Sequence, residues 1–317
     1  MKILLSFIDG PNADLEYSSN DELEIFMNNS NLDGLEIVRC GGSEVVKSEK
    51  VIGVHLPFFN FWIDYYKGDE KRVIEEFGDL KTAKKFYQYE PEDLYKYFLP
   101  DLEYANSNSE YAVFHVADIR NVDYLAQDYH YSDIEVIESS IKLVNKILEN
   151  SNFDKLLLFE NLYFPGLQFN DVSLAKHLLE SINHDKVGFM LDIGHLMNTN
   201  ESIKTEDEGW KYIDRIMDKF ESLKEYFKGI HLHTSLGGEF RQMYKNNPPK
   251  LSEDFYKRFE EIYHYVSEID QHNIVKSPLA NKVIEKISPE YLVLEFSSTN
   301  RNDKEEKLYE QMKILRK

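Results

Sequence analysis

The sequence has little of what marks secreted, membrane-spanning or nucleic-acid-binding proteins. Its single cysteine, Cys40, has no partner for an internal disulfide, which favours a reducing cytoplasm. The apolar run Ile3–Leu5 ends at Ser6, far short of a signal sequence or a membrane span. The net charge of -20 repels phosphate backbones, although local metal cations could outweigh it, so DNA is not excluded. We expect a cytoplasmic protein without membrane contact.

Short apolar runs, each ended by turn residues, alternate with helical patterns along the whole chain. The clearest helix, Ser132–Asn150, opens with the capping-box pair Ser132 and Glu135. The expected strands are Lys2–Phe7, Gly34–Arg39, Val51–Leu56, Tyr111–Val116, Lys155–Glu160, Val187–Asp192, Gly229–His233 and Tyr291–Phe296. Further helices are expected over 171–183, 202–227, 252–269, 278–288 and 304–315. This alternation predicts an α/β fold, a (β/α)8 TIM barrel forming one domain over residues 1–317.

Two connections are longer than a barrel needs. Residues 57–110 follow the third strand, and residues 234–290 follow the seventh. Long insertions usually shape the active-site face of a barrel, so we expect both to be elaborated loops over that face. The first begins with six aromatic residues, which either line the substrate cavity or pack against the outside of the barrel: Phe58, Phe59, Phe61, Trp62, Tyr65 and Tyr66.

Metal-binding side chains stand where the expected strands end. In TIM barrels the carboxyl ends of the strands build the active site. These positions hold His55, His115, Glu160, Asp192, His195, His231 and Glu295, and an Asp270-x-His272 pair precedes the last strand. Each residue alone could be a hydrogen-bonded rim residue, and only one of His231 and His233 need bind a metal. Together they predict a divalent metal centre, because imidazole and carboxylate are shared ligands of zinc, manganese and iron.

The order of these motifs resembles a known superfamily. The segments V-H-L-P, F-H, F-E-N, L-D-I-G-H, I-H-L-H, D-x-H and L-E are similar to those of the xylose-isomerase-like barrels, most closely the endonuclease IV branch (AP endonuclease family 2). The resemblance implies three zinc ions. The first would be held by His55, His115 and Glu160, the second by Glu160, Asp192, His231 and Glu295, and the third by His195, Asp270 and His272. Phe58 stands where the family often has a tyrosine.

Two features depart from the endonuclease IV pattern. Asp270 follows His231 by 39 residues, much more than in the family, and no basic cluster marks a loop for duplex DNA. The aromatic residues after the third strand also indicate a small-molecule substrate rather than DNA. We expect Phe58, Trp62 and His233 to contact this substrate.

Three functions remain open. The first is a hydrolase with two or three divalent ions, expected to be zinc with manganese or iron as alternatives. These ions would activate water for attack on a phosphoester-like or other small substrate. The second is a sugar isomerase or epimerase. For these enzymes the resemblance implies one ion held by Glu160, Asp192, His231 and Glu295, and Glu160 and Glu295 would transfer the proton. The third is a barrel that keeps a metal only for binding or regulation. We favour the hydrolase because it leaves fewer strand-end histidines without a role.

Overall fold

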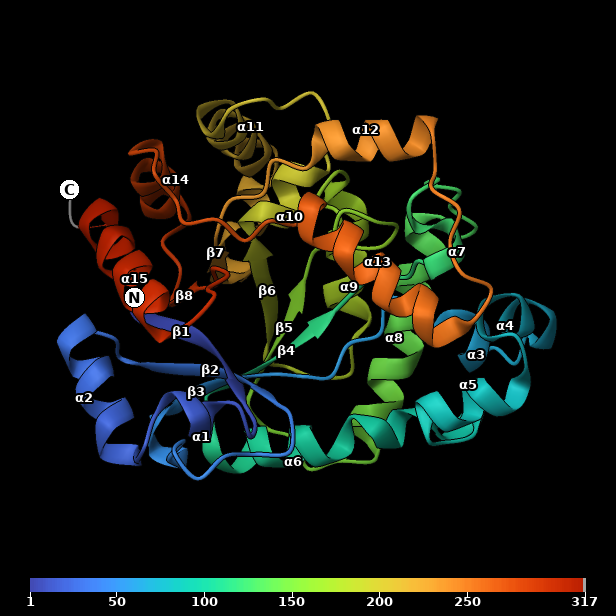
Figure 1. Cartoon of the computed structure of the whole chain (residues 1–317), viewed down its shortest axis with the longest axis horizontal. Coiled ribbons are helices and arrows are strands. Elements are labelled where there is room, and N and C mark those ends of the chain that lie inside the picture. The colour runs from blue at the N-terminus through green and yellow to red at the C-terminus, as the bar shows by residue number, and fades with distance from the viewer. Residues whose placement is uncertain (316–317) are drawn as a thin grey trace.

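The chain folds around a closed barrel of parallel strands. The computed structural model describes residues 1–315. Its strands pair in the order β1 to β8, and β1 pairs with β8 to close the barrel (Figure 1). They are β1 (Lys2–Asp9), β2 (Gly34–Arg39), β3 (Val51–His55), β4 (Tyr111–His115), β5 (Leu156–Glu160), β6 (Val187–Asp192), β7 (Phe227–Leu232) and β8 (Tyr291–Leu294). The predicted (β/α)8 barrel and all eight expected strands are confirmed.

Helices surround the barrel and fill its two long connections. Their bounds are α1 (Ala13–Glu16), α2 (Asn20–Ser30), α3 (Ile63–Tyr66), α4 (Glu70–Phe77), α5 (Leu80–Tyr87), α6 (Leu99–Asn108), α7 (Asn121–Tyr124), α8 (Asp133–Glu149), α9 (Val172–Ser181), α10 (Ile193–Asn198), α11 (Glu206–Lys219), α12 (Gly238–Asn246), α13 (Phe255–Ile269), α14 (Leu279–Ile287) and α15 (Arg301–Leu315). Short 3-10 helices lie at η1 (Ser48–Lys50), η2 (Pro91–Tyr97) and η3 (Glu221–Tyr226). Within residues 1–315, no helix combines the length and apolar character needed to cross a membrane.

Local sequence explains where the covering helices begin and which face they bury. Helix α8 starts at the expected capping box, in which the side chains of Ser132 and Glu135 satisfy free backbone N–H groups. Its residues Ile137 and Val144 are buried against the barrel, and each such side chain contributes about 1.5–3 kcal/mol through burial. A second, smaller cluster that includes Leu4, Tyr111 and Val293 fills the inside of the barrel. The packed layers therefore hold the strand ends rigidly in place.

The two long connections contact each other beside the barrel mouth. At one end of α13, the Phe255 ring lies 4.4 Å from the Phe77 ring of α4. The side chain of Arg258, also on α13, donates to the carbonyl oxygen of Glu76. At the other end, the Asn198 amide of α10 donates to the Ile269 carbonyl over 3.0 Å. Helix α13 thus runs from α4 to α10, as Figure 1 shows. The single-domain organisation and the role of the connections over the active site stay predictions.

Candidate metal centre

The carboxyl ends of the strands, together with the segment after α13, bring all nine predicted ligands together. Ligand atoms of eight of these residues and of His233 form overlapping groups, and within each group the atoms lie within 4.8 Å of one another. The groups are His55, His115 and Glu160; Glu160, Asp192 and His195; Asp192, His233 and Glu295; and His195, His233, Asp270 and His272. His231 adjoins them through Glu160 and Glu295. Their roles as ligands stay predictions, but the proximity that those roles need is present.

The first group joins the ends of β3, β4 and β5. The Nε2 atoms of His55 and His115 lie 3.0 Å apart. The Glu160 Oε2 atom lies 3.1 Å from His55 Nε2 and 3.0 Å from His115 Nε2. His55 Nδ1 donates to the Leu56 carbonyl over 2.8 Å, so Nε2 is the nitrogen with a free lone pair. Two imidazole nitrogens and a carboxylate oxygen that converge in this way fit one divalent cation.

The central group surrounds His231 on β7. Its Nε2 donates to the Glu36 carboxylate of β2 over 2.8 Å. Its Nδ1 lies 3.1 Å from Glu295 Oε2 and 3.3 Å from Glu160 Oε2, while Asp192 Oδ2 is 3.9 Å away. His231 Nδ1 and Glu295 Oε2 are buried atoms without a hydrogen-bond partner. Buried polar atoms are costly without a partner, and a cation among them would satisfy both.

The third group depends on a segment that returns to the barrel after the long excursion. Asp270 Oδ2 lies 2.9 Å from His195 Nε2 and 3.2 Å from His272 Nε2. The segment is held by an antiparallel bridge between Thr234 and Asn273. The Thr234 N–H donates to the Asn273 carbonyl over 2.8 Å, and the Asn273 N–H donates to the Thr234 carbonyl over 3.0 Å. His272 has a left-handed φ of 47°, a conformation that histidine tolerates better than most residues. Its ring is thereby turned toward Asp270.

Second contacts of the imidazoles set which nitrogen is available. His195 Nδ1 donates to the Asn161 carbonyl over 2.9 Å, and His272 Nδ1 donates to the Glu295 carbonyl over 3.0 Å. Like His55, both rings therefore present Nε2 to the cluster. Histidine ligands of metals usually donate their other N–H to a carbonyl or carboxylate in this way. The tautomers and the partnerless atoms together show that the residues fit divalent metal ions.

His233 occupies a more enclosed place than the other histidines. It is fully buried, its Nε2 lies 2.9 Å from Asp192 Oδ2, and its ring stacks on that of His272 at 3.8 Å. A Cβ on Gly194 would lie 2.1 Å from His233 Cε1, so this glycine leaves the space that the ring fills. Gly194 lies in the first turn of helix α10, which begins at Ile193, where the Asp192 carboxylate caps the helix by accepting from the His195 N–H over 2.6 Å. Contact between His233 and substrate stays a prediction, and its burial favours a role toward the metal.

Charge within the cluster is balanced by shifted pKa values. Burial opposes ionisation of Glu160, but His115 and His231 hold its pKa well below the usual range. Burial also opposes protonation of His231 and His195, yet neighbouring carboxylates hold both pKa values well above 6.5. For His272, Asp270 outweighs burial and raises the pKa to about 10. Without metal the cluster therefore holds protons, which metal ions would displace.

These shifts predict how the stability of the metal-free protein depends on pH. A histidine whose pKa is raised on folding stabilises the fold fully below its unfolded value, near 6.5, and this contribution is lost as the pH rises through the folded value. For His272 the window runs from about 6.5 to about 10. We expect the Tm of chelator-treated protein to fall across this window. Zinc-loaded protein should show a smaller fall, because the ions replace the protons. Equal pH profiles for the two forms would contradict the assignment.

The two aromatic residues expected to contact substrate occupy different environments. The Phe58 side chain is 49% exposed, and its ring lies 4.7 Å from His115 and 5.4 Å from His55. Trp62 is only 4% exposed, and its indole N–H donates to the Ala117 carbonyl over 3.0 Å. Phe61 and Tyr65 are also buried. Of this segment, Phe58 is therefore the residue best placed to meet a substrate at the mouth.

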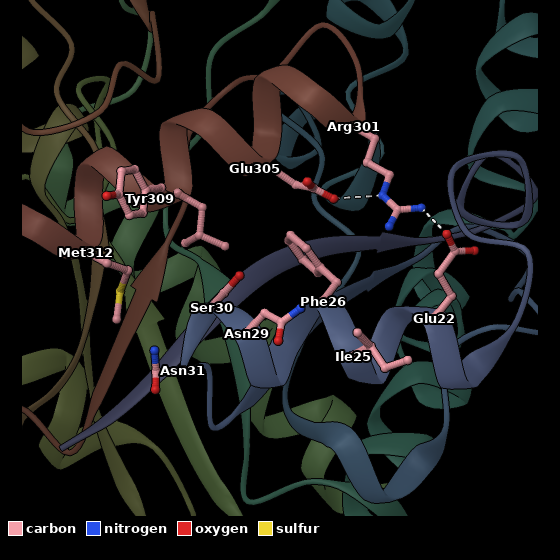
Figure 2. A pocket seen from close by; sticks show the side chains of 11 residues that line it. Glu22, Ile25, Phe26, Asn29, Ser30, Asn31, Arg301, Glu305, Tyr309 and Met312 are labelled. Carbon is pink, nitrogen blue, oxygen red and sulfur yellow. Dashed lines mark hydrogen bonds and ion pairs between the residues drawn. The ribbon is translucent and has the colours of Figure 1, made fainter.

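A surface cavity lies away from the metal cluster. Its volume is about 560 Å³, and its lining residues come from α2, the residue that follows it, and α15. Figure 2 shows Arg301 pairing with Glu22 and Glu305 along one side. Ile25 of α2 is 60% exposed and lines this cavity. The lining, within the described residues, includes none of the predicted ligands. The cavity therefore carries no part of the candidate site.

Comparison with known proteins supports the fold class. No protein-family model matches the chain, and no curated protein matches its sequence. A D-tagatose 3-epimerase-like protein is 15% identical with a TM-score of 0.54, over 100% of this chain and 98% of that one. The IolI protein with a binding zinc atom is 13% identical (TM-score 0.51; 99% and 96% covered), and L-ribulose 3-epimerase is 10% identical (TM-score 0.50; 97% and 86% covered).

Identities this low show a shared fold and no more. The fold and the cluster define this chain as a (β/α)8 barrel with a candidate metal centre at the end of the barrel where the strands have their carboxyl ends. The solved structures of this fold include proteins named as sugar epimerases, and they do not single out the endonuclease IV branch. The zinc in IolI is a property of that protein.

Three supporting residues were not identified from the sequence. Glu36 holds His231, Asn161 bonds both the N–H and the C=O of Asp192, and the Ser235 hydroxyl donates to Asp270 over 2.9 Å. Glu36 left a signal, since it is a carboxylate in the middle of the apolar run G-L-E-I-V. Asn161 lies within the F-E-N motif, whereas nothing in the sequence marks Ser235.

Proposed function

We propose that this protein is a divalent-metal-dependent enzyme of the xylose-isomerase-like kind that isomerises or epimerises a small hydroxy-carbonyl compound. The observation that carries the proposal concerns two buried atoms, His231 Nδ1 and Glu295 Oε2. They lie 3.1 Å apart beside Glu160 and Asp192, and neither has a hydrogen-bond partner. These four residues are the ligand set that the resemblance assigns to isomerases with one ion. The names of similar barrels, D-tagatose 3-epimerase-like protein and L-ribulose 3-epimerase, support this reaction over the hydrolase expected from the sequence.

The chemistry requires a proton to leave and return beside a carbonyl. A divalent ion held by the central group would polarise that carbonyl and make the neighbouring C–H more acidic. Glu295 is 24% exposed in its side chain, whereas those of Glu160 and Asp192 are 2% and 0% exposed. Glu295 is therefore the carboxylate best placed to remove and return the proton. Glu160, whose Oε2 already faces three imidazoles, is better placed to hold cations than to reach substrate.

The surroundings of the mouth support a small substrate. Phe58 offers an exposed apolar ring beside His115, and rings of this kind pack against the C–H face of a sugar. The chain's net charge of -20 disfavours a polyanionic duplex. We propose that the substrate is uncharged or carries few negative charges.

A hydrolase with several metals is a second candidate, favoured by a specific observation. An isomerase with one ion does not need the His55–His115–Glu160 group or the His195–Asp270–His272 group. Several ions bridged by Glu160 and Asp192 would lower the pKa of a bound water and stabilise charge on a phosphoryl oxygen. Zinc is the first expectation for these nitrogen and oxygen donors, with manganese or iron as alternatives.

Proton exchange separates the two reactions. The metal-loaded protein should be incubated in D₂O with a panel of ketoses and aldoses, and in parallel with phosphoesters and a duplex containing an abasic site. We expect deuterium at the carbon beside the carbonyl of one sugar, together with an isomerised product. Glu295→Gln should lower the exchange rate by about 100-fold or more, the usual contribution of a general base. Phosphoester cleavage without sugar exchange would instead establish the hydrolase.

Phe58 and Trp62 form a matched pair of variants. Phe58→Ala should raise KM several-fold with a stability change of about 0.5 kcal/mol or less, because the ring is half exposed. Trp62→Ala should instead lower the free energy of unfolding by about 3–5 kcal/mol and leave the KM of the folded enzyme unchanged. Chemical denaturation and steady-state kinetics provide the two measurements. An unchanged KM in Phe58→Ala would remove this residue from the substrate site.

A further inference from the structure

Glu36 is a buried carboxylate inside the barrel that neither the resemblance nor the predicted ligand set includes. On β2 its neighbours Leu35 and Ile37 belong to the layer between strands and helices, so Glu36 faces the barrel interior. It is 1% exposed. Its Oε1 accepts from His231 Nε2 over 2.8 Å, and its Oε2 accepts from the Tyr111 hydroxyl over 2.7 Å. Each carboxylate oxygen therefore has a dedicated donor from a different strand.

The surrounding strands leave room for this arrangement. A Cβ on Gly53 of β3 would lie 2.3 Å from Tyr111 Cζ and 2.4 Å from its hydroxyl oxygen. The glycine thus leaves the space through which the Tyr111 phenol reaches Glu36. Residues of four strands, β2, β3, β4 and β7, combine to hold one imidazole.

His231 differs from the other anchored histidines in the nitrogen that it presents. His55, His195 and His272 donate through Nδ1 to main-chain carbonyls and turn Nε2 toward the cluster. His231 donates through Nε2 to Glu36, so Nδ1 faces Glu160 and Glu295. A carboxylate that accepts the N–H of a histidine ligand fixes the tautomer of the ring and raises the basicity of the other nitrogen, which binds the metal. A neutral carbonyl raises this basicity less, because it carries no full negative charge.

We propose that Glu36 is the positioning residue of the central metal site: it fixes His231 with Nε2 protonated and Nδ1 directed at the ion between Glu160 and Glu295. This inference rests on the metal centre of the proposed function and not on the reaction catalysed. A purely structural role predicts differently. Replacing a buried ionic contact that serves only the fold changes stability and leaves the affinity for metal unchanged.

Glu36→Gln is the decisive variant because glutamine retains the size and an acceptor oxygen but loses the charge. Zinc affinity should be measured by competition with a chromophoric chelator, and cobalt-substituted protein by visible absorption. We expect one ion per chain to bind about 10–100-fold more weakly, with a changed cobalt spectrum and any further ions unaffected. In ¹⁵N spectra of zinc-loaded wild-type protein, His231 should carry its proton on Nε2.

Two further variants separate positioning from folding. Glu76→Gln alters another carboxylate that is 2% exposed but lies outside the cluster, and it should bind metal as the wild type does. Tyr111→Phe removes the second donor to Glu36, and it should weaken the same ion less than Glu36→Gln does. Wild-type affinity and an unchanged cobalt spectrum in Glu36→Gln would overturn the inference. A wild-type protein that binds no ion would overturn the proposed function as well, whereas ion binding without turnover would leave this test intact.

Discussion

Glu160→Gln is expected to abolish turnover and to weaken every metal ion that this carboxylate holds, which is one ion in the isomerase and more than one in the several-metal candidate. The Glu160 carboxylate is the point at which the groups meet. Its Oε2 lies 3.0 Å from His115, 3.1 Å from His55 and 3.3 Å from His231, and its Oε1 lies 3.4 Å from His195 Nδ1. An amide has one neutral oxygen, and its NH2 group would point hydrogens at a cation or an imidazole. The variant therefore loses the charge that would hold neighbouring cations together.

Metal analysis of protein purified without chelator measures this effect directly. We expect wild-type protein to contain metal that Glu160→Gln lacks. The affinity of the variant for added zinc should be lower than that of the wild type by about 100-fold or more, since even supporting residues of metal sites contribute 10–100-fold. Glu76→Gln, which changes a buried carboxylate that belongs to none of the ligand groups, is the matched control and should keep its metal. A Glu160→Gln protein with full metal content and activity would exclude a bridging role for this residue.

If the third group holds an ion, as the several-metal candidate requires, Asp270→Asn is expected to remove that ion and to leave the others bound. Asp270 Oδ2 faces both His195 and His272, and Oδ1 accepts from Ser235, so the carboxylate is the anionic member of the third group. Burial opposes its ionisation, but His272 and His195 hold its pKa well below the usual value. It is therefore charged and paired at neutral pH, as a metal ligand must be. Asparagine keeps the shape and loses the charge.

Metal content per chain shows whether the third group is a metal site or a hydrogen-bonded cluster. A three-metal centre predicts a decrease of about one ion per chain in Asp270→Asn, measured against zinc standards. Asp118→Asn serves as the control because Asp118 is also buried but caps the N–H groups of Trp62 and Ile63. An unchanged metal content in Asp270→Asn, with only lower stability, would show that this group is a hydrogen-bonded cluster beside a smaller metal site.

Sequence patterns are enough to predict the barrel and the positions of most candidate ligands. Apolar runs set the eight strands, and the carboxyl ends of parallel strands meet at one end of a barrel whatever the loops between them do. Histidines and carboxylates at those ends, such as His55, His115 and Glu160, therefore had to come together. This part of the site could be read from spacing because the fold itself supplies the proximity.

Away from the strand ends, contacts between groups depend on long-range packing that no local pattern records. The return of Asp270 and His272 depends on the Thr234–Asn273 bridge, whose backbone hydrogen bonds leave no sequence signature. The difference between exposed Phe58 and buried Trp62 depends on how the two long connections pack. The orientation of His231 depends on Glu36, 195 residues earlier in the chain. Such contacts join residues through space, and local periodicity records only which face a residue occupies, not which partner it meets there.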